Sequence, residues 1–342
     1  MRWWPIILLI VMLVGCILQP AADPTSLEVS RPTAAPLATA TATLSPTPLI
    51  APLPTATASL TPQPPSTATA TVTPIPTEDT PTEMPPAVTP SVADHYWLER
   101  PIPPEYQDYA DRTYSYGLTA GGRLRPHTAI DLPNPVGTPV LAVGNATVFY
   151  AGSDHDVVFG PKPDFYGNVI VLQMTDFTYK GQPVYTLYGH LSEILVTVGQ
   201  QVSSGEQIGK VGGTGVANGG PHLHFEVRVG NPMDYATSTR NPDLWIKPYY
   251  GYGTLAGRVV DSNGMLLPNI SIIIRSEGSV RYTYTYAGSE NIPDETWGEN
   301  FTYGDLPEGW YEISTQSPRG KIYRARIYVH AGQTAWVEFV FE

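Results

Sequence analysis

The stretch that decides the fold is residues 219–227, which read Gly-Gly-Pro-His-Leu-His-Phe-Glu-Val. Side chains alternate across a β-strand, so the two histidines and the glutamate share one face, and the leucine, phenylalanine and valine share the other. The apolar face predicts a packed core. On the opposite face, His222 and His224 can meet one metal ion or one substrate, because neutral imidazole is the commonest metal ligand in proteins. The alternative is two exposed histidines on an edge strand.

Other strand-like runs surround this stretch. They are rich in Val, Ile and Thr and are mostly bounded by Gly, Pro, Asn or Asp, and they lie at residues 138–150, 168–174, 184–188, 207–211 and 223–229. Apart from a turn near Ser192, no long window shows helical periodicity. We therefore expect an all-β domain over residues 94–250.

A second β-rich unit is expected over residues 251–342. Roughly six or seven short strands, separated by turns, fit a small β-sandwich. The start at 257–259 and the turn at 304–311, Gly-Asp-Leu-Pro-Glu-Gly-Trp-Tyr, resemble the carboxypeptidase regulatory-like, transthyretin-like modules. We expect a passive accessory role or a carbohydrate- or wall-contacting role. Tyr282, Tyr284 and Trp297 are candidate exposed aromatic residues, and the alternative is that they belong to the core.

The net charge of the 342-residue chain is −12. Such a chain offers no basic surface for nucleic-acid phosphates, so we expect no nucleic-acid partner. It would also bind anionic lipid headgroups poorly by charge alone. Any membrane attachment must therefore come from another part of the sequence.

The first 18 residues have the layout of a secretory signal, with a positive start followed by an almost wholly apolar run. The chain's one cysteine, Cys16, rules out an intrachain disulfide, and residues 13–16, Leu-Val-Gly-Cys, resemble the lipobox of bacterial lipoproteins. That resemblance implies cleavage before Cys16 and lipid modification of its thiol. An uncleaved signal anchor is the alternative. In both cases the protein is expected outside the cytoplasm, anchored to the bacterial cell membrane.

Residues 19–93 are dominated by Pro, Thr, Ala and Ser and contain no Phe, Tyr or Trp. Such a segment cannot bury enough apolar surface to offset the entropy of ordering. Its frequent prolines favour extended polyproline II. We expect a disordered stalk between the anchor and the folded part.

The remaining histidines strengthen the metal hypothesis. A catalytic zinc takes three N or O ligands and keeps one position open, and His127, Asp131 and His224 would supply two imidazoles and a carboxylate. In an extended strand, residues four apart are separated by about 13 Å. His127 must therefore lie on a bend or loop that enters the strand carrying Asp131. A further histidine, His190, lies between these motifs in the sequence.

Together these motifs resemble the M23 family of zinc metallopeptidases, of the lysostaphin and LytM type, which cut peptide cross-links in bacterial peptidoglycan. The resemblance covers about residues 105–232 and includes the segments 137–140, 166–168, 198–209, 212–215 and 221–224. One departure is Ala129, where the family usually has Gly. The fold implied is an antiparallel β-sandwich, built as a duplicated hybrid motif, with a groove across one sheet.

The resemblance also implies roles for the site residues. Those that bind the single zinc ion are His127, Asp131 and His224, and the non-ligand histidines beside the reacting carbonyl are His190 and His222. Which of His190 and His222 is the general base stays open, as does whether Glu226 orients an imidazole or is solvated.

The expected function is that of an exported, membrane-tethered zinc metalloendopeptidase, monomeric, that hydrolyses peptide bonds in peptidoglycan. Zinc would lower the pKa of bound water toward 7, and a histidine would take the water proton. The alternative is a non-catalytic LytM-type protein that binds the wall or activates another hydrolase.

Overall fold

The computed structural model describes residues 94–342. The predicted signal peptide (1–18), the lipidation site Cys16 and the predicted stalk (19–93) lie outside the described residues. Within the described part, no helix combines the length and apolar character that crossing a membrane requires. The all-β prediction is confirmed, because one short 3-10 helix (Pro242–Leu244) is the helical element of this part of the chain.

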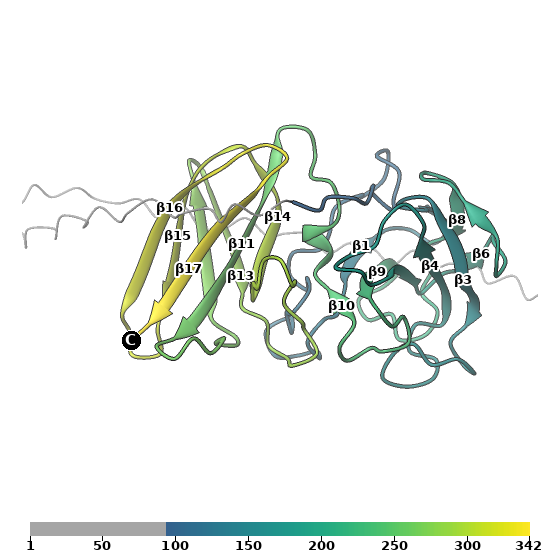
Figure 1. Ribbon diagram of the computed structural model, residues 1–342, viewed down its shortest axis with the longest axis horizontal. Coiled ribbons are helices and arrows are strands. Elements are labelled where there is room, and N and C mark those ends of the chain that lie inside the picture. Colours follow the sequence, from purple (N-terminus) through teal and green to yellow (C-terminus); the bar gives the residue numbers. More distant parts are fainter. Residues whose placement is uncertain (1–93) are drawn as a thin grey trace, which may run out of the picture. The chain divides into compact units, whose positions relative to one another are not determined.

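The first β-unit consists of a large antiparallel sheet and a small one (Figure 1). The large sheet has the order β1-β9-β5-β4-β3-β7, and β10 pairs with β9. Its strands are β1 (Ile130–Pro133), β3 (Ala146–Ser153), β4 (Asn168–Met174), β5 (Val184–Gly189), β7 (Gln201–Val202), β9 (His222–Val229) and β10 (Thr239–Arg240). The small sheet has the order β2-β8-β6, with β2 (Pro139–Leu141), β6 (Glu193–Ile194) and β8 (Gln207–Lys210). The predicted run 138–150 is therefore two strands in two sheets.

Strand β9 lies inside the large sheet, between β1 and β5, and all eight of its residues are buried. Its apolar side chains, Leu223, Phe225 and Val227, belong to the main core cluster, as predicted. The alternative of exposed histidines on an edge strand is wrong. The histidines of β9 face the interior of the protein, where burial of a polar group requires partners.

The second β-unit contains a three-stranded sheet, β14-β11-β17, and a four-stranded sheet, β13-β12-β15-β16, around their own apolar cluster. Of the three candidate aromatic residues, Tyr282 and Tyr284 are exposed, whereas Trp297 is buried. The strands are β11 (Tyr252–Asp261), β12 (Ser271–Ser276), β13 (Ser279–Tyr284), β14 (Phe301–Pro307), β15 (Gly309–Gln316), β16 (Ile322–Val329) and β17 (Thr334–Phe341).

The two β-units share buried apolar surface. Ala256, Trp297 and Trp336 belong to the same buried cluster as the core of the first unit. The indole rings of Trp297 and Trp336 stack with a centroid separation of 6.0 Å. The predicted domain boundary between residues 250 and 251 stays a prediction. Because the two units share this core, experiments on the folded protein use residues 94–342 as one piece.

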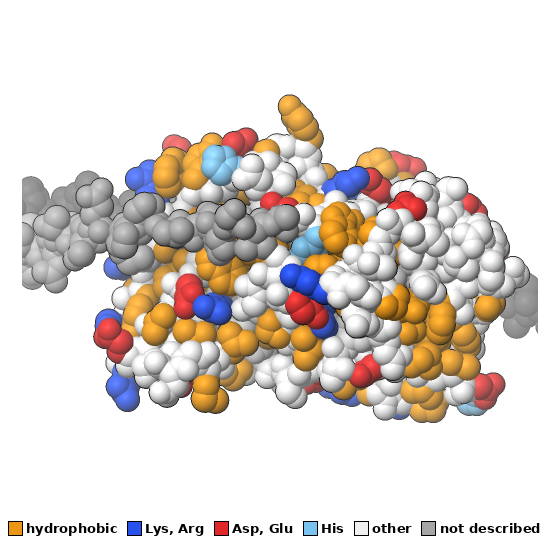
Figure 2. Space-filling model, in the orientation of Figure 1, with side chains coloured by type: hydrophobic (Ala, Val, Ile, Leu, Met, Phe, Trp, Pro, Cys, Tyr) orange, Lys and Arg blue, Asp and Glu red, His pale blue; other side chains and the backbone are white. Residues whose placement is uncertain are grey.

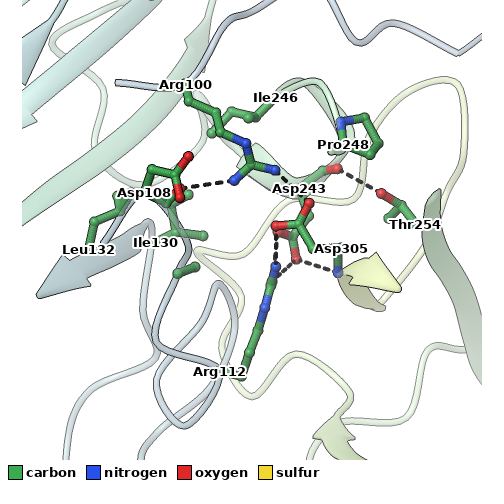
Figure 3. A pocket seen from close by; sticks show the side chains of 12 residues that line it. Arg100, Asp108, Arg112, Ile130, Leu132, Asp243, Ile246, Pro248, Thr254 and Asp305 are labelled. Carbon is green, nitrogen blue, oxygen red and sulfur yellow. Dashed lines mark hydrogen bonds and ion pairs between the residues drawn. The ribbon is translucent and has the colours of Figure 1, made fainter. Parts of the chain in front are cut away.

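Ion pairs reinforce this joint (Figure 3). The Arg112 guanidinium donates to both carboxylate oxygens of Asp243 at 2.8 Å, and Arg100 pairs with Asp305 at 2.5 Å. The hollow among these residues has about 20 Å³, which is room for one water molecule. It is part of the joint between the units rather than a ligand site.

The visible surface carries mixed charge. On the face drawn in Figure 2, acidic and basic side chains are interspersed and basic ones do not gather into a broad patch.

Candidate metal centre

His127 lies in the loop that enters β1, as the spacing to Asp131 predicts. Its backbone N–H donates to the Leu118 carbonyl at 3.0 Å, and its ring Nδ1–H donates to the Tyr114 carbonyl at 2.7 Å. The Tyr114 ring stacks on the imidazole at 4.0 Å between centroids. Because the carbonyl takes the Nδ1 proton, the Nε2 lone pair of His127 is left to face a metal ion.

Asp131 and His224 are opposite each other in the pairing of β1 with β9. Their side chains meet with Oδ1 and Nδ1 3.1 Å apart, and His127 Nε2 lies 3.3 Å from each of these atoms. A tetrahedral zinc with bonds of 2.0–2.1 Å places its donor atoms about 3.3 Å apart. The residue types and the spacing of these three side chains therefore fit a zinc ion.

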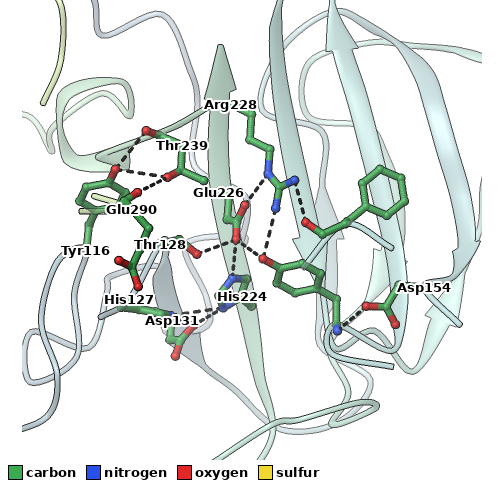
Figure 4. A network of polar contacts seen from close by, with 12 residues as sticks. Tyr116, His127, Thr128, Asp131, Asp154, His224, Glu226, Arg228, Thr239 and Glu290 are labelled. Atoms are coloured by element: carbon green, nitrogen blue, oxygen red, sulfur yellow. Dashed lines mark hydrogen bonds and ion pairs between the residues drawn. The ribbon is translucent and has the colours of Figure 1, made fainter. Parts of the chain in front are cut away.

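A buried network orients His224 (Figure 4). Its Nε2–H donates to Glu226 Oε1 at 3.1 Å, which leaves Nδ1 for the metal. Glu226 also accepts from Thr128 at 3.0 Å, from Tyr166 at 2.5 Å and from Arg228 Nε at 2.6 Å. The question left open by the sequence is thus answered by geometry, since Glu226 is fully buried and holds the imidazole of His224.

Electrostatics in this network follow from burial and charge. Burial raises the pKa of Glu226, but the Arg228 guanidinium and the bond from His224 outweigh it and hold that pKa below its ordinary value. Burial lowers the pKa of His224, yet its bonds to Asp131 and Glu226 raise that pKa to about 9. A divalent cation would displace this proton, since metal binding to histidine releases protons.

His190 and His222 form a second pair beside the cluster, with ring centroids 4.8 Å apart. Each fixes its tautomer on a backbone carbonyl: His190 Nδ1–H donates to Thr214 at 2.8 Å, and His222 Nδ1–H donates to Gly220 at 2.9 Å. Burial lowers the pKa of His222 and lowers that of His190 to about 3. Both rings are therefore neutral at pH 7, with Nε2 able to accept a proton.

His190 occupies a strained position directly after β5. Its φ is +61°, a left-handed conformation that is uncommon for a residue with a side chain. A Cβ at Gly212 would lie 2.6 Å from the His190 carbonyl oxygen, so only glycine fits at that point. Such strain persists where the surrounding structure over-determines it, often at functional sites.

A competing donor group exists among the described residues. The ligand atoms of His190, His222 and His224 also lie within 4.8 Å of one another. Both groups need His224, whose Nδ1 lies against Asp131 and His127. The group with Asp131 fits a dication better, because its carboxylate balances charge.

A groove of about 360 Å³ opens at the cluster. Asp131 and His222 line one part of it, and Tyr114 and Arg123 line another. A neighbouring hollow of about 380 Å³ shares two lining residues with it and includes Tyr284 of the second β-unit. By contrast, His155 is exposed, bonds Asp164 at 2.8 Å and belongs to neither donor group.

Sequence reasoning did not identify the supporting residues Tyr114, Thr128 and Arg228. A signal existed for Arg228, because residues 222, 224, 226 and 228 alternate onto one face of a strand. Tyr166 was noted as part of a motif but not as a partner of Glu226. For Tyr114 the contact depends on a loop whose path no local pattern predicts.

The residues around this cluster are similar to those of known peptidases. Residues 125–235 match the pattern described as Peptidase family M23. The peptidoglycan DD-endopeptidase ShyA of Vibrio cholerae serotype O1 is 40% identical over 113 residues, which are 33% of this chain and 23% of that protein. The DD-carboxypeptidase/endopeptidase Mpg of Neisseria meningitidis serogroup B is 36% identical over 124 residues, 35% of this chain and 24% of that protein.

Among solved structures, a mutant of the catalytic domain of the prophage-encoded M23 protein EnpA of Enterococcus faecalis is 30% identical. That match covers 39% of this chain and 89% of that one, with a TM-score of 0.31. The chain spans under a quarter of the length of the two curated relatives. The matched region encloses every histidine and aspartate of the cluster, and residues 125–235 form a domain of peptidase family M23.

Proposed function

We propose that the protein is a zinc metalloendopeptidase that hydrolyses peptide bonds in peptidoglycan. The observation that carries this proposal is the convergence of His127 Nε2, Asp131 Oδ1 and His224 Nδ1 at 3.1–3.3 Å. Two further neutral imidazoles, His190 and His222, stand beside them. One zinc ion per chain, bound by His127, Asp131 and His224, completes the proposed centre.

Zinc, when bound, lowers the pKa of a bound water toward 7 and polarises a carbonyl. The remaining chemistry falls to the two non-ligand histidines. Each holds its Nδ1–H on a backbone carbonyl, so each presents Nε2 as a proton acceptor. His222 Nε2 is 3.5 Å from Asp131 Oδ2, beside the proposed zinc site, so we propose His222 as the general base. His190 would stabilise the oxyanion only with a proton on its Nε2, because that role requires a hydrogen-bond donor.

The substrate proposal rests on the relatives' names. ShyA is named a peptidoglycan DD-endopeptidase, and Mpg is named a DD-carboxypeptidase/endopeptidase. The D,D-peptide bonds of peptidoglycan cross-links are therefore the first to test. Groove residues near the cluster, among them Arg123 and Tyr114, are positioned to contact a peptide.

The test uses residues 94–342, because the two β-units share a core. Zinc-loaded protein is incubated with purified peptidoglycan, with and without a chelator, and released fragments are identified by mass spectrometry. New peptide ends that vanish with the chelator and in His222→Ala support the enzyme. Stoichiometric zinc without any release would instead favour the non-catalytic, hydrolase-activating alternative.

We also propose that the protein is exported and anchored to the bacterial cell membrane through a lipidated Cys16, and that it is a monomer there. The support is the sequence of residues 1–18 and the Pro- and Thr-rich composition of 19–93. Labelling with a fatty-acid probe should mark the wild type but not Cys16→Ser. Soluble, unlabelled wild-type protein would contradict the anchor.

For residues 251–342 we propose a carboxypeptidase regulatory-like module. Its support is the sandwich of a three-stranded and a four-stranded sheet, together with the turn motif at 304–311. The exposed Tyr282 and Tyr284 leave a wall-contacting role open to a pull-down of the 94–342 protein with cell-wall material.

A further inference from the structure

We infer that the second β-unit positions the metal centre, and that Asn291 is the positioning residue through which it acts on His127. The inference deepens the proposed function and rests on it for the identity of the metal. The segment concerned is residues 285–300, which connects β13 to β14. It reaches the His127 loop from the other β-unit, more than 150 residues along the chain.

The contact is direct. The Asn291 side-chain Nδ2 donates to the His127 backbone carbonyl at 2.6 Å. The same carbonyl accepts from the Gly117 N–H at 2.8 Å. Both bonds are buried, and Asn291 itself is only 4% exposed. The main chain of a proposed zinc ligand is thus held by one bond from its own loop and one from the second β-unit.

The orientation of the Asn291 amide is fixed by chemistry. An oxygen placed where Nδ2 lies would face the His127 carbonyl and repel it. Among the described residues, the buried Asn291 Oδ1 has no hydrogen-bond partner. Burying the Asn291 amide with its oxygen unpaired costs free energy. The bond from Nδ2 to the His127 carbonyl is the hydrogen bond that offsets this cost.

The segment that bears Asn291 is itself pinned on both sides. Toward the first unit, Ala287 N–H donates to the Gly117 carbonyl at 2.9 Å, and Ile292 N–H donates to the Tyr116 hydroxyl at 2.9 Å. Toward the second unit, Thr285 N–H donates to the Ile270 carbonyl at 2.9 Å. Hydrogen bonds to both units therefore hold segment 285–300 in place, and we call this segment the brace.

His127 needs such a brace more than the other donors do. Asp131 and His224 sit on paired strands, where the ladder of β1 and β9 fixes their backbones. His127 precedes β1 and has no place in that ladder. Outer contacts that hold a metal-binding histidine typically account for about 10–100-fold in metal affinity or activity, and loss of one of two such bonds should fall at the lower end.

The experiment measures the zinc dissociation constant of residues 94–342 by chelator competition. Asn291→Ala should raise it about 10-fold, and hydrolysis should recover when zinc is saturating. Asn291→Asp, which puts an oxygen against the His127 carbonyl, should raise it further. The visible absorption of the Co²⁺-substituted protein should change in both variants, because the geometry around His127 is altered.

Asn300→Ala is the matched control. This buried asparagine bonds the backbone of Val259 and Leu267, within the second unit, and does not touch His127. It should lower the melting temperature yet leave zinc affinity and the Co²⁺ spectrum as in the wild type. Wild-type zinc affinity in Asn291→Ala, or an equal loss in Asn300→Ala, would overturn the inference. Failure of the proposed function would look different: a wild type that binds zinc but cleaves no peptidoglycan.

Discussion

The two histidines that converge on the metal centre are held by opposite strategies. His224 is supported from within its own strand, since its partner Glu226 lies two residues away and Arg228 a further two. His127 is supported from outside its sheet, by the Tyr114 carbonyl and by Asn291 of the second β-unit. The first support is local in sequence and charged, and the second is distant and neutral. This contrast implies that the candidate metal centre depends on both β-units, and the following variants test that dependence.

The largest effects should come from the donors themselves. His224→Ala removes an atom that both candidate donor groups need, so zinc should be lost and hydrolysis should fall by about 10³-fold or more. His127→Ala should do the same only if the group with Asp131 holds the metal. Zinc content and kcat/KM measure both. Full zinc content in His127→Ala would assign the ion to His190, His222 and His224 instead. The control is His155→Ala, an exposed position, which should leave zinc content and kcat/KM unchanged.

The second effect concerns the charged support. Glu226→Gln keeps the size of the side chain but removes the charge that His224 and Arg228 share, so zinc affinity should fall by about 10–100-fold. The buried Arg228 loses its partner, which should lower the free energy of unfolding by about 3–5 kcal/mol. Chelator competition and chemical unfolding give the two values. Glu193→Gln, which breaks only the exposed pair with Lys210, is the control.

If the local support is the stronger one, Glu226→Gln should weaken zinc binding more than Asn291→Ala does. A larger loss of zinc affinity in Asn291→Ala would contradict this order, because the distant brace would then be the stronger support. Equal losses would mean that neither strategy has an advantage at this site.

The same comparison shows what the sequence could predict. The face of β9 that carries His222, His224 and Glu226 follows from strand alternation alone, and the loop position of His127 follows from its spacing to Asp131. These local rules predicted the all-β fold, and the resemblance to the M23 family grouped the five site residues. The position of β9 inside its sheet depends on which strands pair, and alternation cannot show that.

The brace could not be predicted for a different reason. The bond from Asn291 to His127 spans 164 residues and joins two units that the composition marks as separate. Asparagine in a loop normally suggests a turn, and nothing local distinguishes one that reaches into another unit. Trp297 was a candidate exposed aromatic residue with the core as its alternative, and its indole lies in the core that the two units share.

A third prediction targets the joint beneath the His127 loop. Gly117 has φ +81°, and a Cβ there would lie 2.2 Å from Cδ1 of the Tyr286 ring. Gly117→Ala should therefore lower the free energy of unfolding by more than about 1 kcal/mol and weaken zinc binding, since the Gly117 N–H bonds the His127 carbonyl. Thermal melts and chelator competition report the two effects. Gly121→Ala has a similar φ of +71° with no atom within 4 Å, so it carries the backbone strain alone. Identical behaviour of the two variants would show that the close approach of the units is unimportant.

The smallest effect separates the two supports by pH. Burial and the nearby Asp294 raise the pKa of Glu299, which anchors the brace, from 4.5 to about 8. A carboxyl whose pKa is raised on folding binds its proton more tightly in the folded state, so its contribution to stability is complete below pH 4.5 and is lost as pH rises to about 8. The sign is opposite for Glu226, whose lowered pKa favours the folded state at higher pH.

The melting temperature of the metal-free protein, measured between pH 5 and pH 9, should therefore fall less steeply with rising pH in Glu299→Gln than in the wild type. About 2–4 °C is expected for each kcal/mol in a unit of this size. Only the difference between the two curves counts, because other groups titrate in both proteins. Curves that stay parallel from pH 5 to pH 8 would mean that Glu299 is ionised in the folded state, and the neutral character of the brace would then be wrong. A difference that changes between pH 5 and pH 8 and becomes constant above pH 8 would place the protonated carboxyl at the joint that holds His127.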